Sequence, residues 1–82
     1  MFSDIIKNFE GKTVGTYIFH KLYGNQKLTI CNFQPLCVDN KIGFIIGGQE
    51  IFLYHDEIEN FKFEKNMLEI NGTLQKMIIK KI

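Results

Sequence analysis

The chain has 82 residues, of which 45% are hydrophobic and 23% charged, and its formal net charge is +1. A chain of this length holds one hydrophobic core, so we expect a single small domain over residues 1–82 and exclude a multidomain enzyme. The apolar content is typical of a folded globular protein and excludes a disordered tail.

The first predicted element is a two-turn helix over residues 4–10. Ser3 is a candidate N-cap, Ile5, Ile6 and Phe9 recur at helical spacing, and Gly11 suits the left-handed residue that ends a helix. Because so short a helix is unstable alone, we expect it to lay its apolar stripe on a sheet.

From residue 12 onward the apolar periodicity changes to two, which predicts strands. Residues 13–22 and 27–33 are expected to form a hairpin around residues 23–26, with Gly24 and Asn25 in a two-residue turn. That turn sets Phe19 opposite Ile30 and Ile18 opposite Cys31. The face predicted to enter the core then carries Tyr17, Phe19, Leu28 and Ile30. The other face is apolar too, which calls for cover on both sides by the helix, by barrel closure or by a second subunit.

The middle of the chain is predicted to contain two strands separated by turns. Gln34-Pro35 interrupts the first ladder because proline has no amide hydrogen, and Asp39-Asn40 forms a turn before a strand at 42–46. Gly47-Gly48 is a further turn, and residues 50–55 form the next strand, which Asp56-Glu57 ends.

Residues 61–70 carry the clearest hairpin pattern. A two-residue turn at Lys65-Asn66 pairs Phe63 with Leu68, Phe61 with Ile70 and Lys62 with Glu69. Asn71-Gly72 indicates a last turn with two possible registers. A strict two-residue loop sets Leu74 beside Glu69 on the polar face, whereas a three-residue loop with a bulge turns Leu74 and Ile78 to the apolar side.

These elements predict a mainly β (α+β) fold, with a short N-terminal helix followed by five or six antiparallel strands rolled into a small barrel. The order helix, Gly11-Lys12, long hairpin, then residues 42–46 and 50–58 resembles the order of elements in Sm-like small β-barrels. The resemblance implies a barrel fold and, as in the family's ring-forming members, an oligomer that binds single-stranded RNA.

Few side chains could support catalysis or hold a metal. The nitrogen and sulfur ligands are His20, Cys31, Cys37 and His55, and they lack the paired spacing of zinc sites. Nothing indicates a nucleophile beside a base and an oxyanion hole, so we expect no catalytic residues, no metal, no cofactor and no enzyme activity. One disulfide is arithmetically possible, but free buried thiols are expected in the cytoplasm.

The preferred functional hypothesis is a small binding module, an adaptor or inhibitor that contacts another protein. Acidic and aromatic side chains alternate over residues 50–59, and this strand would add a partner's strand if it lay at a sheet edge. The predicted contact residues are Glu50, Phe52, Tyr54, Glu57 and Glu59. The same alternation is also typical of a half-buried strand. Self-association is expected as well, since so small a core is marginal and an oligomer buries more apolar surface.

The alternative hypothesis is an Sm-like oligomer that binds single-stranded RNA through aromatic rings and lysines. Its candidate residues are Tyr17, Lys21, Lys27 and Phe33. The chain has no arginine, the side chain best suited to gripping phosphates, so lysines or backbone amides would have to hold any anion.

The composition also indicates origin and compartment. Arginine and alanine, which have GC-rich codons, are absent, while isoleucine, lysine, phenylalanine and asparagine are abundant. This bias predicts an AT-rich bacterial or phage genome. No signal peptide is visible at residues 1–10, and the longest uncharged stretch, 28–38, is too short to span a bilayer, so a cytoplasmic protein without membrane contact is expected.

Overall fold

The computed structural model describes residues 2–82, with side chains from Asp4 onward. The described residues form two antiparallel sheets, one of five strands in the order β2-β1-β8-β7-β6 and one of three in the order β3-β4-β5. Neither sheet closes on itself, so the prediction of a mainly β fold is confirmed and the predicted barrel of five or six strands is wrong. The elements are α1 (Phe2–Lys7), β1 (Val14–His20), β2 (Gly24–Ile30), β3 (Gln34–Val38), β4 (Lys41–Ile46), β5 (Gln49–Tyr54), the 3₁₀ turn η1 (His55–Glu57), β6 (Ile58–Glu64), β7 (Met67–Gly72) and β8 (Gln75–Lys81).

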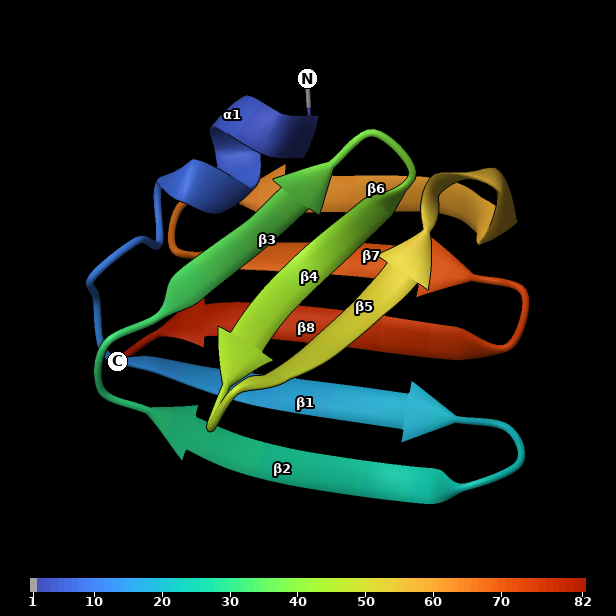
Figure 1. The fold of residues 1–82 in the computed structure, drawn as a ribbon, viewed down its shortest axis with the longest axis horizontal. Coiled ribbons are helices and arrows are strands. Elements are labelled where there is room, and N and C mark those ends of the chain that lie inside the picture. Colours follow the sequence, from blue (N-terminus) through green and yellow to red (C-terminus); the bar gives the residue numbers. More distant parts are fainter. Residues whose placement is uncertain (1) are drawn as a thin grey trace.

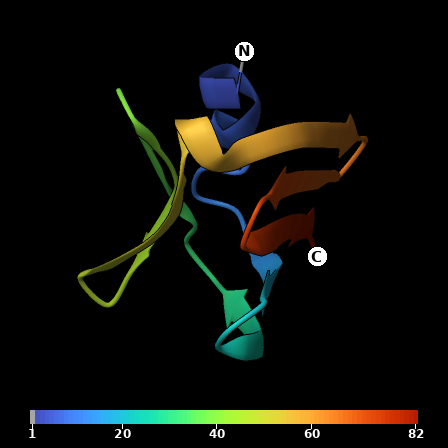
Figure 2. The same ribbon diagram turned by 90° about the vertical axis from the view of Figure 1, so that its right-hand side faces the viewer.

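The two sheets pack face to face, and the three-stranded sheet crosses in front of the five-stranded one (Figure 1). Seen from the side, they enclose a wedge with α1 over one end (Figure 2). Because side chains alternate between the two faces of each strand, every strand gives one set of residues to this wedge and turns the other set outward. The fully buried apolar side chains are Ile6, Phe9, Val14, Phe33, Ile42, Phe44, Leu53, Leu68, Ile70, Met77 and Ile79.

The N-terminal helix packs on the sheets as predicted, although its bounds differ. Ile6 and Phe9 are fully buried in the common core, and the Phe9 ring meets Phe33 and Phe63 edge-on at 6.3 Å each. The helix begins at Phe2, which places Ser3 inside its first turn, so the prediction of Ser3 as N-cap is wrong. Gly11 has a φ of 75° and follows the helix in the turn that leads to β1.

The first hairpin has a different register from the predicted one. Phe19 pairs with Asn25 and His20 with Gly24, so the chain turns at residues 21–23. The partner of Phe19 is therefore five residues earlier in the sequence than the predicted partner, Ile30. A side chain holds this turn: the backbone amides of Leu22 and Tyr23 donate to His20 Nδ1 at 3.1 and 3.3 Å. Gly24 then supplies the positive φ, 83°, that closes the loop.

An odd shift of register exchanges the two faces of a strand. The residues of β1 that face the core are therefore Val14, Thr16 and Ile18, and the prediction that Tyr17 and Phe19 enter the core is wrong. Leu28 and Ile30 do face the core as predicted. The fully buried Thr16 satisfies its hydroxyl by donating from Oγ1 to the carbonyl of Leu28 at 3.2 Å.

We expect His20→Ala to lower the free energy of unfolding by about 1 to 2 kcal/mol, because two turn amides lose their acceptor. Urea denaturation measures this loss. Tyr23→Ala is the matched control, since the Tyr23 side chain stacks on His20 with ring centroids 4.6 Å apart but accepts neither amide. An equal loss in both variants would show that ring contact, and not the hydrogen bonds, holds the turn.

The three-stranded sheet follows the predicted turns closely. The glycines of the β4–β5 turn, Gly47 and Gly48, have φ values of 58° and 79°, and η1 ends β5 at the predicted Asp56-Glu57. The first ladder already ends at Ile30, so Gln34-Pro35 does not interrupt it as predicted. Pro35 instead lies within β3, a strand that the sequence did not predict, and pairs with Phe44. The position is tolerated because β3 is an edge strand, where a missing amide hydrogen can face away from the ladder.

The C-terminal half contains the most accurate prediction and another shifted turn. Phe61 pairs with Ile70, Lys62 with Glu69 and Phe63 with Leu68, as predicted. In the last hairpin Ile70 pairs with Met77 and Glu69 with Ile78, which moves the loop from Asn71-Gly72 to the residues between β7 and β8. Both predicted positions of Leu74 are therefore wrong. Leu74 lies in the loop, 45% exposed, and Ile78 faces outward beside Glu69.

Candidate binding faces of the two sheets

Each sheet turns one face to the core and leaves the other face uncovered by any element of residues 2–82 (Figures 1 and 2). We call the uncovered face of the three-stranded sheet the Phe52 face. In its register Leu36, Gly43 and Phe52 form one row across the strands, Val38, Lys41 and Tyr54 a second, and Gln34, Ile45 and Glu50 a third.

The Phe52 face combines two aromatic rings with one ion pair. The rings of Phe52 and Tyr54 meet edge-on with centroids 5.1 Å apart. Lys41 Nζ lies 4.5 Å from the Phe52 ring centroid and 3.2 Å from Glu50 Oε1. Val38 and Tyr54 remain 50% and 44% exposed, so much of the apolar surface of this face is accessible to a partner.

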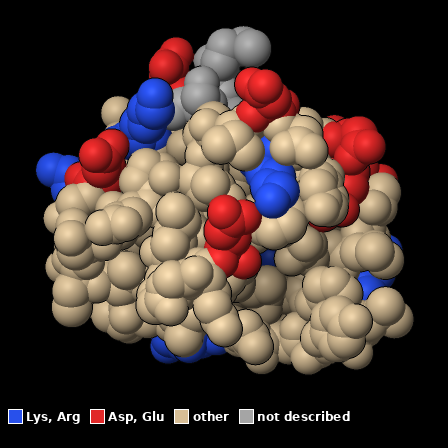
Figure 3. Space-filling view, viewed as in Figure 1, with Lys and Arg blue, Asp and Glu red and all other residues tan. Residues whose placement is uncertain are grey.

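Carboxylates gather around one end of the Phe52 face. The β3–β4 turn carries Asp39 and η1 carries Asp56 and Glu57, and the two turns are joined because the His55 amide donates to the Asn40 carbonyl at 2.9 Å. Figure 3 shows a mostly uncharged surface over the three-stranded sheet, with one acidic and one basic side chain inside it and both acidic and basic side chains along the outline. Together with Glu50, four carboxylates stand against the one ammonium of Lys41.

The sequence-predicted contact residues do not all lie together. Glu50, Phe52 and Tyr54 share the Phe52 face, and β5 is an edge strand as the strand-addition hypothesis requires. The edge is partly occupied, because Gln75 Nε2 donates to the Phe52 carbonyl at 3.2 Å and to Glu57 Oε1 at 3.3 Å. Glu57 is half-buried, so part of its carboxylate serves the contact between the sheets.

Glu59 lies on β6, in the other sheet, and borders a hollow on the opposite side of the molecule. It is therefore separated from the other predicted contact residues. The prediction was made from neighbours along the chain, and η1 turns the chain from one sheet into the other between Tyr54 and Glu59.

The RNA-binding candidates are divided in the same way. Phe33 is fully buried between Phe9 and Phe44, with ring centroids 6.3 and 5.5 Å away, so it cannot stack on a base. Tyr17 and Lys27 pair directly across β1 and β2 on the uncovered face of the five-stranded sheet, with Lys27 Nζ 5.6 Å from the ring centroid. Lys21 follows β1 in the adjoining turn.

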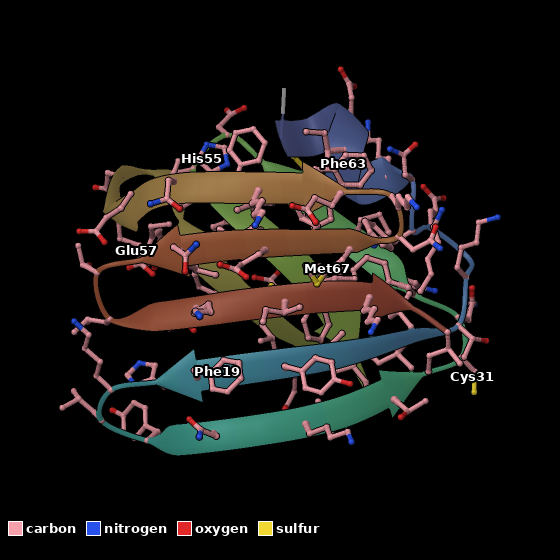
Figure 4. The ribbon with its side chains drawn as sticks, turned by 180° about the vertical axis from the view of Figure 1, so that it is seen from behind. Phe19, Cys31, His55, Glu57, Phe63 and Met67 are labelled. Atoms are coloured by element: carbon pink, nitrogen blue, oxygen red, sulfur yellow. The ribbon has the colours of Figure 1, made fainter. Side chains whose placement is uncertain are left out.

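The thiols and imidazoles do not converge. Cys31 is exposed and lies beyond the end of β2 away from the turn that His20 holds (Figure 4), and Cys37 is half-buried. Both thiols are free, but the prediction that they are buried is wrong for Cys31. Among residues 2–82 no three His, Cys, Asp or Glu side chains come together as a metal site. Within the same residues no helix has the length and apolar character needed to cross a membrane.

Sequence reasoning missed the residues that β3 and β4 give to the Phe52 face. Val38, Lys41 and Ile45 reach it only through the register of three strands. Phe19 was missed as a surface residue because the register of the first hairpin was shifted. The signal that could have found it is His20, whose ring can accept turn amides two and three residues later.

Comparisons with models of protein families, with curated proteins and with solved structures found no match to this chain.

Proposed function

We propose that this protein is a non-enzymatic binding module of the cytoplasm, from an AT-rich bacterium or phage, that contacts another protein through the Phe52 face. The observation that carries the proposal is an accessible apolar and aromatic surface with a charged rim. Aromatic residues at the centre of a patch and polar residues at its rim are the usual anatomy of a protein interface. Val38 and Tyr54, at 50% and 44% exposure, are the open part of this surface.

The charge at the rim selects the class of partner. Asp39, Asp56 and Glu57 lie at one end of this face, and Glu50, in the row at the other end, is already paired with Lys41. A partner with a basic rim around an apolar centre would gain electrostatic steering and lose little through desolvation. We therefore propose a basic protein surface as the partner, bound by an adaptor or an inhibitor.

The uncovered face is a better contact than the edge of β5. A partner strand added at this edge would have to displace the Gln75 amide from the Phe52 carbonyl. The rings of Phe52 and Tyr54 need no such rearrangement, because they already point away from the core. Two copies of the chain could also pair through this same face, which would be the route of the expected self-association.

Affinity purification from cells of the source organism tests the proposal. We expect Tyr54→Ser combined with Val38→Ser to reduce the captured partner at least 10-fold, because both side chains are exposed on the Phe52 face. The control pair is Tyr23→Ser with Leu22→Ser, which removes an aromatic and an aliphatic side chain that are 83% and 72% exposed in the β1–β2 turn. Equal capture by both double variants and the wild type would contradict the proposal.

Solution mass separates the two kinds of occupant. If copies of the chain pair through this face, sedimentation equilibrium of the pure protein gives a dimer that Tyr54→Ser with Val38→Ser makes monomeric. If the partner is a different protein, the pure chain remains monomeric, and capture alone changes with the variants.

A further inference from the structure

We call the uncovered face of the five-stranded sheet the Tyr17 face. It also carries aromatic residues, but lysines surround them, whereas carboxylates gather at the Phe52 face. Alternation along the strands and the register place Lys27, Tyr17, Ile78, Glu69 and Lys62 in one row across it and Asn25, Phe19, Lys76, Asn71 and Asn60 in the next. A third row holds Thr29, Gly15, Lys80, Met67 and Glu64. From this arrangement we propose that the Tyr17 face binds single-stranded nucleic acid.

The two rings are arranged as stacking surfaces. Tyr17 leans along its own strand over Gly15: a Cβ built at Gly15 would lie 3.4 Å from the Tyr17 hydroxyl and 3.6 Å from its ring. The glycine therefore lets the phenol ring lie close against the sheet, with its other side turned outward. Phe19, two residues further along β1, is 38% exposed and projects from the same face (Figure 4).

The spacing of the rings suits an extended strand. Residues two apart on a β-strand are separated by about 6.6 Å, so Tyr17 and Phe19 can each receive one of two neighbouring bases. Bases stack on aromatic side chains without regard to sequence, since every base has a π-face. A duplex cannot use these rings, because its bases are already stacked on one another.

Each ring is accompanied by a lysine from the neighbouring strand. Lys27 Nζ lies 5.6 Å from the Tyr17 centroid, and Lys76 Nζ lies 5.6 Å from the Phe19 centroid. No carboxylate among the described residues forms an ion pair with either ammonium, whereas Lys62 is paired with Glu64 at 3.1 Å. When a base stacks on a ring, the displaced ammonium is free to bind the phosphate of that nucleotide.

The charge of this face supports the assignment. Lys27, Lys62, Lys76 and Lys80 stand against Glu64 and Glu69 on the face itself, an excess of two positive charges, and Lys21 and Glu59, which both border the hollow beside Phe19, cancel each other. The opposite side of the molecule has the reverse balance. A polyanion is therefore attracted to the Tyr17 face and repelled by the rim of the Phe52 face.

A hollow of about 450 Å³ beside Phe19 provides room for one base. Asn25 and Asn71 line it at the two sides of Phe19 and Lys76 in the same row. The Asn25 amide can donate to and accept from base edges, whereas Asn71 Nδ2 already donates to Asn60 Oδ1 at 2.9 Å and to Glu69 Oε2 at 3.0 Å, so Asn71 offers its Oδ1 as an acceptor. Glu59 borders the same hollow and is its one carboxylate. Its charge opposes a nearby phosphate.

Fluorescence anisotropy with labelled 12-residue oligouridylate and oligothymidylate at low salt tests the proposal. We expect both to bind and Phe19→Ala to weaken binding about 5- to 150-fold, the range that corresponds to the loss of one stacked base. Phe19→Leu, which keeps an apolar side chain at this position, should fold normally and weaken binding similarly. Tyr54→Ala, which removes a similarly exposed ring from the opposite sheet, should bind as the wild type does.

Charge variants give an independent reading of the same complex. The slope of log affinity against log salt concentration should become about 1.4 less steep in the double variant Lys27→Gln, Lys76→Gln. This is the contribution expected from two lysines that contact the phosphates of a single strand. Glu59→Gln should raise the affinity because it removes the repulsive charge from the hollow. Stronger binding of RNA than of DNA would indicate recognition of the 2′-hydroxyl, and equal binding would indicate stacking and charge alone.

Three outcomes would overturn the proposal. The first is absence of binding at low salt, where lysine contacts are strongest. The second is binding that Phe19→Ala and Phe19→Leu leave unchanged, or that a duplex matches. The third is a Phe19-dependent dimer or Phe19-dependent cosedimentation with phosphatidylglycerol vesicles without oligonucleotide binding, which would assign the face to a second copy or to a lipid surface.

Discussion

Replacing Gly43 by alanine should leave most of the protein unfolded at room temperature. Gly43 lies in the centre of β4, where the neighbouring strand approaches so closely that a Cβ would overlap the Ile51 carbonyl oxygen and lie 2.6 Å from the Phe52 Cα. These atoms belong to the backbone, so no side-chain rotation can relieve the overlap. Overpacking against movable side chains already costs about 1 to 3 kcal/mol, and we expect a larger loss here.

The loss is large compared with the total stability of the domain. A chain of this size has a free energy of unfolding of about 4 to 12 kcal/mol. Circular dichroism with urea denaturation should show a much lower midpoint for Gly43→Ala or no folded baseline. Because Phe52 follows the displaced backbone, any folded fraction should also lose the contact between Lys41 and the Phe52 ring.

Gly15→Ala is the matched control for this prediction. Gly15 is also a buried strand glycine without positive φ, but its added Cβ would make an ordinary contact at 3.4 Å with the Tyr17 hydroxyl, at the end of a movable side chain. Since glycine weakens a strand interior, this variant should be neutral or gain about 0.5 kcal/mol. Equal stability of the two alanine variants would contradict the close approach of β4 and β5.

Truncating Phe33 to alanine should cost about 3 to 5 kcal/mol of unfolding free energy. The ring is fully buried and packs between Phe9 and Phe44, so it joins the segment after α1 to the three-stranded sheet. Its removal leaves a cavity that three separate segments line. Thermal or urea unfolding measures the loss.

The same substitution separates a core role from a binding role for Phe33. Tyr23→Ala, at an 83% exposed position, is the control and should change stability by well under 1 kcal/mol, apart from its contact with His20. If Phe33→Ala kept full stability while abolishing oligonucleotide binding, the residue would be the RNA contact that the sequence suggested, and its burial in the core would be wrong.

The accuracy of the sequence-based predictions depended on how each turn is held. The hairpin of β6 and β7 was predicted in register because a two-residue loop and the pairing of Lys62 with Glu69 agree on one arrangement. The hairpin of β1 and β2 was not, because His20 captures the turn amides with its side chain. Positive φ at Gly24 was expected, but its place in the turn was not.

The candidate binding faces could be predicted only in part for the same reason. Glu50, Phe52 and Tyr54 are neighbours along one strand, so alternation alone places them together. Val38 and Lys41 join them through pairing with other strands, and Phe19 joins Lys76 through the pairing of β1 with β8. Such contacts depend on long-range register, which local turn chemistry did not determine. The barrel prediction was wrong because it too required long-range strand pairing, and the strands pair into two separate open sheets.

The most direct test of binding through the two uncovered faces uses the three tyrosines of the chain. Tyr17 lies on the face of the five-stranded sheet, Tyr54 on the face of the three-stranded sheet, and Tyr23 in the β1–β2 turn. A photoreactive p-benzoylphenylalanine replaces each in turn, and cells of the source organism are irradiated. We expect position 54 to yield a protein adduct, position 17 a nucleic acid adduct, and position 23 neither. Adducts at position 23 as abundant as those at 54 and 17, or no adduct at 54, would contradict binding through these faces.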